Sequence, residues 1–421
     1  MRQNEHAMQL RGDERRELEM ISDATLRFGE ALASALLGLD RLYAAESTAD
    51  PSNVSGNTAR LVVLELADNL SVDQFGSYED ALAAFGELAA RAKSLPEPDR
   101  QVYYSETCAS ARAFAHWRSS GLAFADQIAH FLHVPAKPAD LAELETLKSE
   151  MRTVLNDLGY SGDLSSQITT WESQQRVPAD EVEDTLNDLL SDAWDLTARH
   201  MDMPGDKSDG MRIETVSGAY YNAKCDFSNR LIQLNIDPTL TRPGLRHLAV
   251  HEGYPGHYVQ FKRRQIGYQQ GRTPADALLS VVNTASSTPF EGIADAGMAI
   301  IGWSNGLDDR LSGLLTRYRA GIATRAAWRL HAEDADPESV RDDLLRDALV
   351  GGEGWVAARM RFISASDRAA LIWSYWQGEP NVMPVWERVV SRPELHKNYF
   401  DFIYDRMHSV NSIALFDDTV N

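Results

Sequence analysis

Cysteine and long apolar runs are scarce in this sequence. The 421 residues include only two cysteines, Cys108 and Cys225, and these lie far apart in the chain. That number excludes a disulfide framework and a cysteine-rich metal site. No segment reaches the roughly 18 apolar residues that a membrane-spanning helix needs, and the first twenty residues contain no apolar stretch of signal-peptide length. We therefore expect a cytoplasmic protein without a membrane partner.

Positive charge is also in short supply. Lysine and arginine number 41 against 62 aspartates and glutamates, which gives a net charge of −21. An acidic surface repels phosphate backbones and anionic lipids, so we expect no nucleic-acid partner and no membrane surface. The length is enough for one large domain or two of ordinary size with a substantial core. Nothing in the sequence indicates an oligomeric state.

Helical periodicity dominates what is present. A helix is predicted after Asp140, which is a suitable N-cap, and another follows Pro178. The stretch 202–211 is polar and carries glycine and proline, which favours a boundary between an N-terminal helical region, 1–205, and a catalytic region, 206–421. We expect the two regions to pack as one continuous body.

One segment carries a persuasive strand signal. β-branched and aromatic residues flank a polar turn at Asp226–Asn229, which predicts a β-hairpin over roughly 213–236. From Thr241 to the C-terminus the pattern is helical again. The predicted fold class is therefore mainly α, with a small β-hairpin or short sheet near the active site.

The informative segment is "TRPGLRHLAVHEGYPGHYVQFKRRQ", which begins at Thr241 as an N-cap with Pro243 in the first turn. His251-Glu252 matches the opening of the zinc motif HExxH. In that motif two histidines four residues apart grip one ion from one helical face, and the glutamate faces a bound water. Here the fifth position is Pro255, and the next histidine is His257.

Six residues on a straight helix correspond to about 600° of rotation, which would point the two imidazoles apart. Pro255 cannot donate a hydrogen bond to the carbonyl of His251 and disfavours helical geometry at the residue before it. The helix is therefore predicted to end or kink at Gly253–Tyr254, and a second to start at Pro255, so that His251 and His257 converge. The alternative is a pair of ordinary helix histidines beside a proline kink.

A third ligand is available in "TPFEGIADAGMAIIGW". Glu291 lies in an otherwise apolar run, where an unpaired carboxylate is costly to bury, and Asp295 follows on the same helical face, where it could orient a ligand histidine. The alternative for Glu291 is an exposed glutamate near a helix N-terminus. His247 and His251 form a competing pair, four residues apart, that would ligate a metal with Glu291 and leave His257 without a role.

"VHEGYPGHYVQ" resembles the HEAxPGHHLQ signature of the family known as domain of unknown function 885, which is grouped with the zincin-type metallopeptidases. "FEGIADAG" resembles that family's EGWALYxE motif. "SYWQGEP" resembles its Tyr-x-x-Gly segment, and the "YY" of the hairpin resembles its aromatic counterpart. The resemblance covers about 213–380. It implies a large helical zincin-like architecture, with one zinc per chain held by His251, His257 and Glu291, and with Glu252 as general base.

The chain departs from this family pattern in places that concern the substrate pocket more than the metal. The second histidine of the family's "GHH" is Tyr258, and the tryptophan after Glu-Gly is Ile293. Of a family Asp-x-Gly-x-His stretch, at most His331 remains.

Three protein ligands would leave an open position for water, and Glu252 would accept its proton. The hydroxyl of Tyr375 is the first candidate to stabilise an oxyanion and Tyr221 the second; each could equally be a packing residue. Arg317 and Arg319 could bind a substrate carboxylate, or form structural ion pairs.

The predicted function is a zinc-dependent hydrolase, foremost a metallopeptidase that cleaves small peptides, whose substrate could lie extended against an exposed strand edge. Two alternatives remain open: a zinc hydrolase of a non-peptide amide or ester, and a degenerate zincin that acts as a binding or scaffold protein.

Overall fold

The computed structural model describes residues 21–49, 60–219, 221–304 and 306–417. Residues 1–20, on which the prediction of no signal segment rests, lie outside these ranges, and the cytoplasmic location stays a prediction. Within the described ranges, none of the helices combines the length and the apolar character needed to cross a bilayer.

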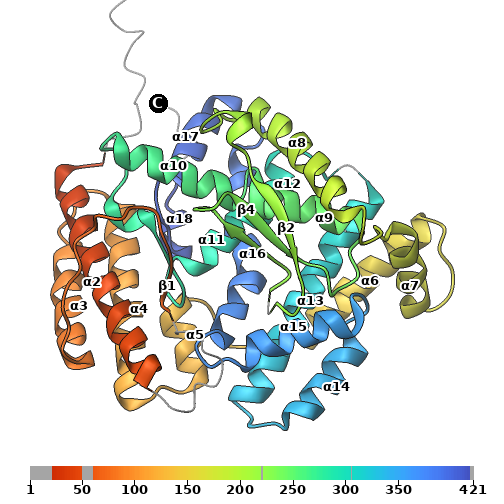
Figure 1. Ribbon diagram of the computed structural model, residues 1–421, viewed down its shortest axis with the longest axis horizontal. Helices are drawn as coiled ribbons and strands as arrows, with labels where there is room; N and C mark the ends of the chain where they lie inside the picture. Colours follow the sequence, from red (N-terminus) through yellow and green to blue (C-terminus); the bar gives the residue numbers. More distant parts are fainter. Residues whose placement is uncertain (1–20, 50–59, 220, 305, 418–421) are drawn as a thin grey trace, which may run out of the picture.

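Helices make up most of the described chain, so the prediction of a mainly α fold is confirmed (Figure 1). The N-terminal helices are α2 (Asp23–Ala49), α3 (Tyr78–Ala92), α4 (Pro98–Ser120), α5 (Phe124–Leu132), α6 (Leu141–Asp157), α7 (Leu164–Gln175) and α8 (Val182–His200). Those that follow are α9 (Arg242–Leu248), α10 (His257–Gln269), α11 (Ser287–Asp295), α12 (Gly297–Ile300), α13 (Leu307–His331), α14 (Pro337–Asp347), α15 (Gly352–Ser364), α16 (Ile372–Val389), α17 (Pro393–Tyr404) and α18 (Val410–Ile413).

Two predicted helix starts are confirmed by their capping bonds. The side chain of Asp140 accepts a hydrogen bond from the backbone N–H of Ala142 at the start of α6. Thr241 accepts one from the N–H of Gly244, with proline in the first turn of α9. In both cases a side-chain oxygen satisfies a backbone donor that has no partner inside the helix.

The predicted hairpin is part of a three-stranded sheet. β3 (Ala223–Asp226) and β4 (Leu231–Asn235) pair antiparallel across the predicted polar turn, in which Asn229 donates its N–H to Asp226. β2 (Arg212–Val216) was predicted as part of the same hairpin, and this was wrong: it pairs parallel with β4, on the side away from β3. A parallel pair needs a crossover rather than a tight turn, so turn signals give no indication of it.

A second, two-stranded sheet was missed. β1 (Val62–Glu65) pairs antiparallel with β5 (Leu279–Val281), more than two hundred residues away in sequence. The expectation that the chain is entirely helical after Thr241 is therefore wrong at β5. Strands of three and four residues are too short to show an alternating pattern. The apolar run around β5 is equally compatible with a helix and with a strand.

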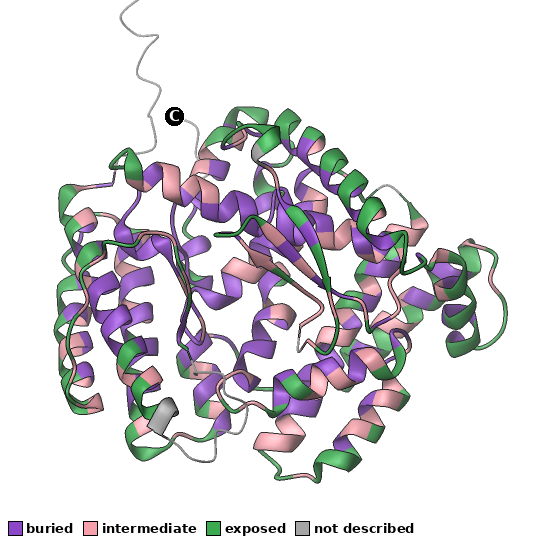
Figure 2. Cartoon of the chain, viewed as in Figure 1, coloured by how far each residue is buried: buried purple, intermediate pink, exposed green. Residues whose placement is uncertain are grey.

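Two hydrophobic cores hold the elements together. The first joins α2–α7 to α13, α15 and the start of α16, with Trp171 and Trp373 among its fully buried side chains. The second joins α8, the three-stranded sheet, α9, α10 and α17. Figure 2 shows that the most buried segments run through the middle of the molecule. Both cores combine residues from the two sides of the predicted 205/206 boundary, and that division stays a prediction.

Candidate metal centre

The helix that begins with α9 is interrupted between His251 and His257. α9 passes into a single π-helical turn over Ala249–Gly253, and Tyr254 is then extended, with φ −127° and ψ 117°. The predicted interruption between Gly253 and Pro255 is confirmed, although α10 starts at His257 rather than at Pro255. The N–H of Gly256 donates to the carbonyl of Val250, and a Cβ at Gly256 would clash with the carbonyl oxygen of His251. Only glycine allows this close return of the chain.

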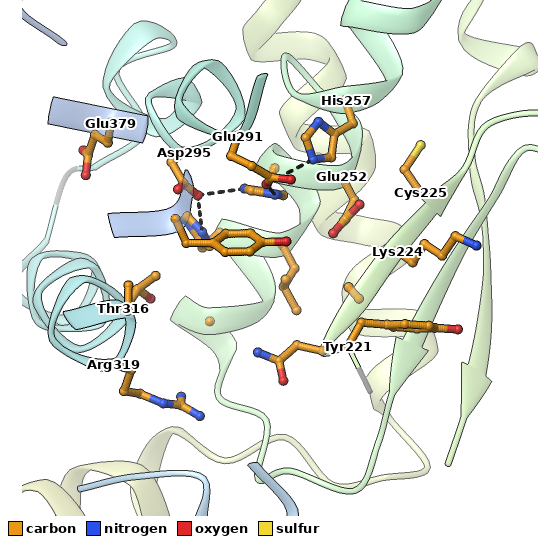
Figure 3. A pocket seen from close by; sticks show the side chains of 18 of the residues that line it. Tyr221, Lys224, Cys225, Glu252, His257, Glu291, Asp295, Thr316, Arg319 and Glu379 are labelled. Carbon is orange, nitrogen blue, oxygen red and sulfur yellow. Dashed lines mark hydrogen bonds and ion pairs between the residues drawn. The ribbon is translucent and has the colours of Figure 1, made fainter. Parts of the chain in front are cut away.

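This break brings the two imidazoles together. The ring centroids of His251 and His257 lie 4.6 Å apart, at an interplanar angle of 80°. Glu291, from α11, lies between them: its Oε2 is 3.3 Å from Nε2 of His251 and 3.6 Å from Nε2 of His257. Figure 3 shows Glu291 and His257 facing each other across the site. The three side chains come from three different elements.

The donor set fits a zinc ion. Two ligands of a tetrahedral zinc, each about 2.0–2.1 Å from the ion, lie about 3.3 Å apart, close to the two separations between Glu291 and the histidines. Glu291 Oε2 is buried and makes no hydrogen bond of acceptable geometry in the described chain, despite its two imidazole neighbours. A buried acceptor without a partner is costly, and a cation shared with His251 and His257 would satisfy it.

Asp295 holds His251 from the other side. Its Oδ1 lies 2.8 Å from Nδ1 of His251, one helical turn beyond Glu291 on α11. A carboxylate on one ring nitrogen fixes the tautomer and directs the other nitrogen to a metal. Burial by itself lowers the pKa of His251, but Asp295 and Glu291 together raise it well above its usual value. The contacts of Glu291 with His251 and His257 hold the pKa of Glu291 at about 2, against the opposing effect of burial.

His247 belongs to a different group. Its Nε2 lies 3.4 Å from Oδ1 of Asp295, the atom that also faces His251. Within the described ranges, two sets of potential ligands converge: His251, His257 and Glu291, and His247, His251 and Asp295. The alternative set of His247, His251 and Glu291 is not brought together.

Glu252 lies next to the candidate ligands His251, His257 and Glu291 but does not belong to that group. Its side chain is almost fully buried, and it makes no hydrogen bond or ion pair with another described residue. It lines the same cavity as the two histidines and points into it, beside His257 and Glu291 (Figure 3). A carboxylate kept unpaired beside a water-accessible space is available to accept a proton.

Tyr375 reaches the site because two helices pack unusually closely. A Cβ at Gly292 of α11 would clash with the backbone of Gly378 on α16, so neither position has room for a side chain. Tyr375, on the same helix as Gly378, lines the cavity, and its hydroxyl makes no hydrogen bond within the described chain. Burial, followed by the negative charge of Glu291, raises the pKa of Tyr375 well above its usual value. It therefore keeps its proton as a hydrogen-bond donor.

The cavity has a volume of about 840 Å³ and also includes Tyr221, Arg317 and Arg319 in its lining. The hydroxyl of Tyr221 donates to Gln233 on β4, and the side chain points away from the histidines (Figure 3). Tyr221 is therefore not positioned to stabilise an oxyanion. Arg317 donates to the carbonyl of Trp376 and stacks on the indole of that residue, which agrees with a structural role.

Three residues were singled out because they concern departures from the family pattern: Tyr258, Ile293 and His331. They lie in the interior or away from the cavity. Tyr258 and Ile293 are buried in the second core. The Nε2 of His331 lies 2.6 Å from the carbonyl oxygen of Ile363, and His331 does not line the cavity.

Two cavity residues were missed in the sequence. Glu379 lies one helical turn after Tyr375, and burial, with Asp295 close by, raises its pKa. The four-residue spacing inside "SYWQGEP" could have indicated it. Arg359, from α15, is the other. No motif surrounds Arg359, so only the packing of α15 against α13 and α14 brings it to the cavity.

No family model matches this chain, and no curated protein matches it. Several solved structures are similar to it, including the following two. A predicted lipoprotein from Colwellia psychrerythraea superposes with a TM-score of 0.55 and 14% identity, over 80% of this chain and 66% of that one. A predicted lipoprotein of unknown function from Shewanella oneidensis gives a TM-score of 0.50 and 13% identity, over 80% and 70%. The chain thus spans about two thirds of the length of these proteins. At such identities the likeness shows the fold alone, and the family resemblance stays a prediction.

Proposed function

We propose that this protein is a zinc-dependent hydrolase that cleaves small peptides. One observation carries the proposal: His251, His257 and Glu291 converge at metal-ligand separations beside the unpaired carboxylate of Glu252, in one cavity. A structural zinc site usually has four protein ligands and needs no base. Three ligands with an adjacent free carboxylate are the arrangement that hydrolysis requires.

A zinc ion in this site would act as a Lewis acid, able to lower the pKa of a water molecule to about 7. Glu252 is the residue positioned to take the proton from the attacking water and to pass it to the leaving amine. Tyr375 offers a protonated hydroxyl to the oxygen that becomes negative as the carbonyl is attacked. Asp295 orients His251 throughout.

The neighbouring sheet favours a peptide as substrate. β3 is an edge strand, because the order of the sheet is β2-β4-β3, and the residues of β3 line the cavity. An edge strand presents backbone N–H and C=O groups that can pair with an extended peptide. A non-peptide amide or ester would make no use of this edge.

The Glu252→Gln variant tests the proposal. The amide is nearly isosteric with the carboxylate but cannot accept a proton. We expect zinc content to match that of the wild type and hydrolysis of a mixed peptide library to fall by about two to four orders of magnitude. Zinc content by elemental analysis and cleavage by mass spectrometry provide the two readouts.

Wild-type turnover by zinc-loaded Glu252→Gln protein would rule out this mechanism. A zinc-loaded wild-type protein that cleaves no peptide, but hydrolyses simple esters or amides, would instead support the non-peptide alternative. Zinc loading without any hydrolysis would support a binding role.

A further inference from the structure

Two arginines meet at one tryptophan on the wall of the cavity. The guanidinium carbon of Arg319, from α13, lies 4.1 Å from a ring centroid of the Trp355 indole, and the guanidinium carbon of Arg359 lies 5.6 Å from a ring centroid of the same residue. Trp355 itself is almost fully buried. Contact with an aromatic face stabilises a cation and fixes its position, so both guanidinium groups are held in place.

Neither guanidinium has an acceptor. Among the residues that the structure describes, Arg319 and Arg359 make no hydrogen bond and no ion pair, and the Nε of each is buried without a partner. The carboxylate of Glu172 acts on the charge of Arg319, but its Oε1 already accepts the N–H of Gly351. Arg317, two residues before Arg319 on the same helix, has both a carbonyl and a carboxylate partner. Arg319 and Arg359 therefore differ from their neighbour Arg317, because they have no protein acceptor among the described residues.

Two unpaired cations in one cavity wall are unfavourable unless a ligand compensates them. Burial, and then repulsion by Arg359, lowers the pKa of Arg319 to about 9, and burial also lowers the pKa of Arg359. A guanidinium nevertheless keeps its charge at neutral pH. Five N–H donors in a planar fork match the geometry of a carboxylate. A site that holds two such forks without acceptors has the composition of an anion-binding site.

This positive region is connected to the candidate metal centre. Arg359 lies 5.6 Å from the ring of Phe362, and Phe362 is 6.3 Å from the ring of Tyr375. Tyr375 in turn is affected by the charges of both Arg359 and Glu291. The cavity thus has an acidic end, around Glu291, and a basic end, at Arg319 (Figure 3), and Tyr375 lines the same cavity.

We propose that Arg319 and Arg359 together bind a carboxylate of the substrate, which in a small peptide is its C-terminal carboxylate. This inference rests on the proposed peptidase function and narrows it. A peptide anchored by its C-terminus at the arginines extends toward the metal centre, so the enzyme removes a short C-terminal fragment. Peptides with a blocked C-terminus are then poor substrates.

Binding and turnover are measured separately so that the two proposals can fail independently. In Glu252→Gln protein, calorimetry compares N-acetyl-Ala-Ala with its C-terminal amide. We expect the carboxylate form to bind about ten- to hundredfold more tightly, because charge-assisted hydrogen bonds to arginine supply the difference. Arg319→Gln and Arg359→Gln in the same background should each abolish most of that preference. Arg319→Lys, which keeps the charge but loses the fork, should restore part of it.

Arg346→Gln is the matched control, since Arg346 is exposed and lies in surface ion pairs away from the cavity; it changes the net charge equally and should leave the preference unchanged. The two cavity variants should melt at the same temperature as the parent or higher, because each removes an uncompensated cation. Thermal denaturation therefore shows whether each variant is folded. If one of the two variants unfolds, the binding preference of the other variant and of Arg319→Lys still tests the proposal.

Equal binding of the acid and the amide would overturn the carboxylate site, whether or not peptides are cleaved. A preference that survives in both arginine variants would overturn it too, because the carboxylate would then bind elsewhere, for example at the metal. A preference that depends on the arginines, in a protein that cleaves no peptide, would keep the anion site and reject the peptidase. Cleavage of acid and amide peptides at equal rates would keep the peptidase and reject the anion site.

Discussion

Removing His257 and removing His247 should have very different effects on zinc binding. The two histidines belong to the two convergent groups, which share His251. His251 directs Nε2 to Glu291 and Nδ1 to Asp295, at 3.3 and 2.8 Å. A metal in the His247 group would displace the shorter contact, and it would leave Glu291 and His257 without a metal to coordinate. We therefore expect one zinc ion, at His251, His257 and Glu291.

The size of each effect follows from the role of the side chain. Structural zinc sites with four protein ligands bind with about 10–16 kcal/mol, which is about 2.5–4 kcal/mol for each ligand. His257→Ala removes one ligand and should weaken zinc binding by about two to three orders of magnitude. His247→Ala removes a neighbour of Asp295 but no ligand, so its effect should stay at or below about tenfold.

Competition with a chromogenic chelator measures both affinities, and elemental analysis after dialysis gives the stoichiometry. Circular dichroism of each variant without added metal controls for folding. A His247→Ala protein that loses zinc while His257→Ala retains it would refute the ligand assignment. An equal loss of zinc affinity in the two variants would refute the view that Asp295 orients His251 and is not itself a ligand.

Three further expectations concern residues around the same centre. Asp295→Asn should weaken zinc binding by about ten- to hundredfold, measured by the same competition, because the amide no longer fixes the His251 tautomer. Tyr375→Phe should keep full zinc content but lower kcat by about a hundredfold or more, if the hydroxyl stabilises the oxyanion; an unchanged kcat would remove Tyr375 from the mechanism. In chelator-treated protein, the pKa of Glu291 is about 2 in the folded state, below the usual value of about 4.3. The resulting stability is present above that usual value and is lost as pH falls toward 2, so urea denaturation at pH 5 and pH 3 should show a smaller loss for Glu291→Gln than for the parent.

Local rules in the sequence determine much of the candidate metal centre. Thr241 caps its helix because a hydroxyl can accept a backbone hydrogen bond there, and Pro255 interrupts the helix because proline has no N–H to donate. Both effects act within a few residues, so they can be read without a structure. The same reasoning predicted the interruption between the two histidines, and it identified Glu291 and Asp295 as acids one turn apart.

Other features depend on contacts between distant segments. The pairing of β1 with β5, the parallel partner of β2, and the meeting of Arg319 with Arg359 all join residues that no spacing rule relates. Arg317 and Tyr221 were both candidates for substrate contact. In the structure Arg317 donates a hydrogen bond to the carbonyl of Trp376, and Tyr221 donates one to Gln233. A sequence specifies which side chains can act as ligands, donors or cations. Which of them remain without partners inside the cavity is decided by packing, because each partner comes from an element far away in the chain.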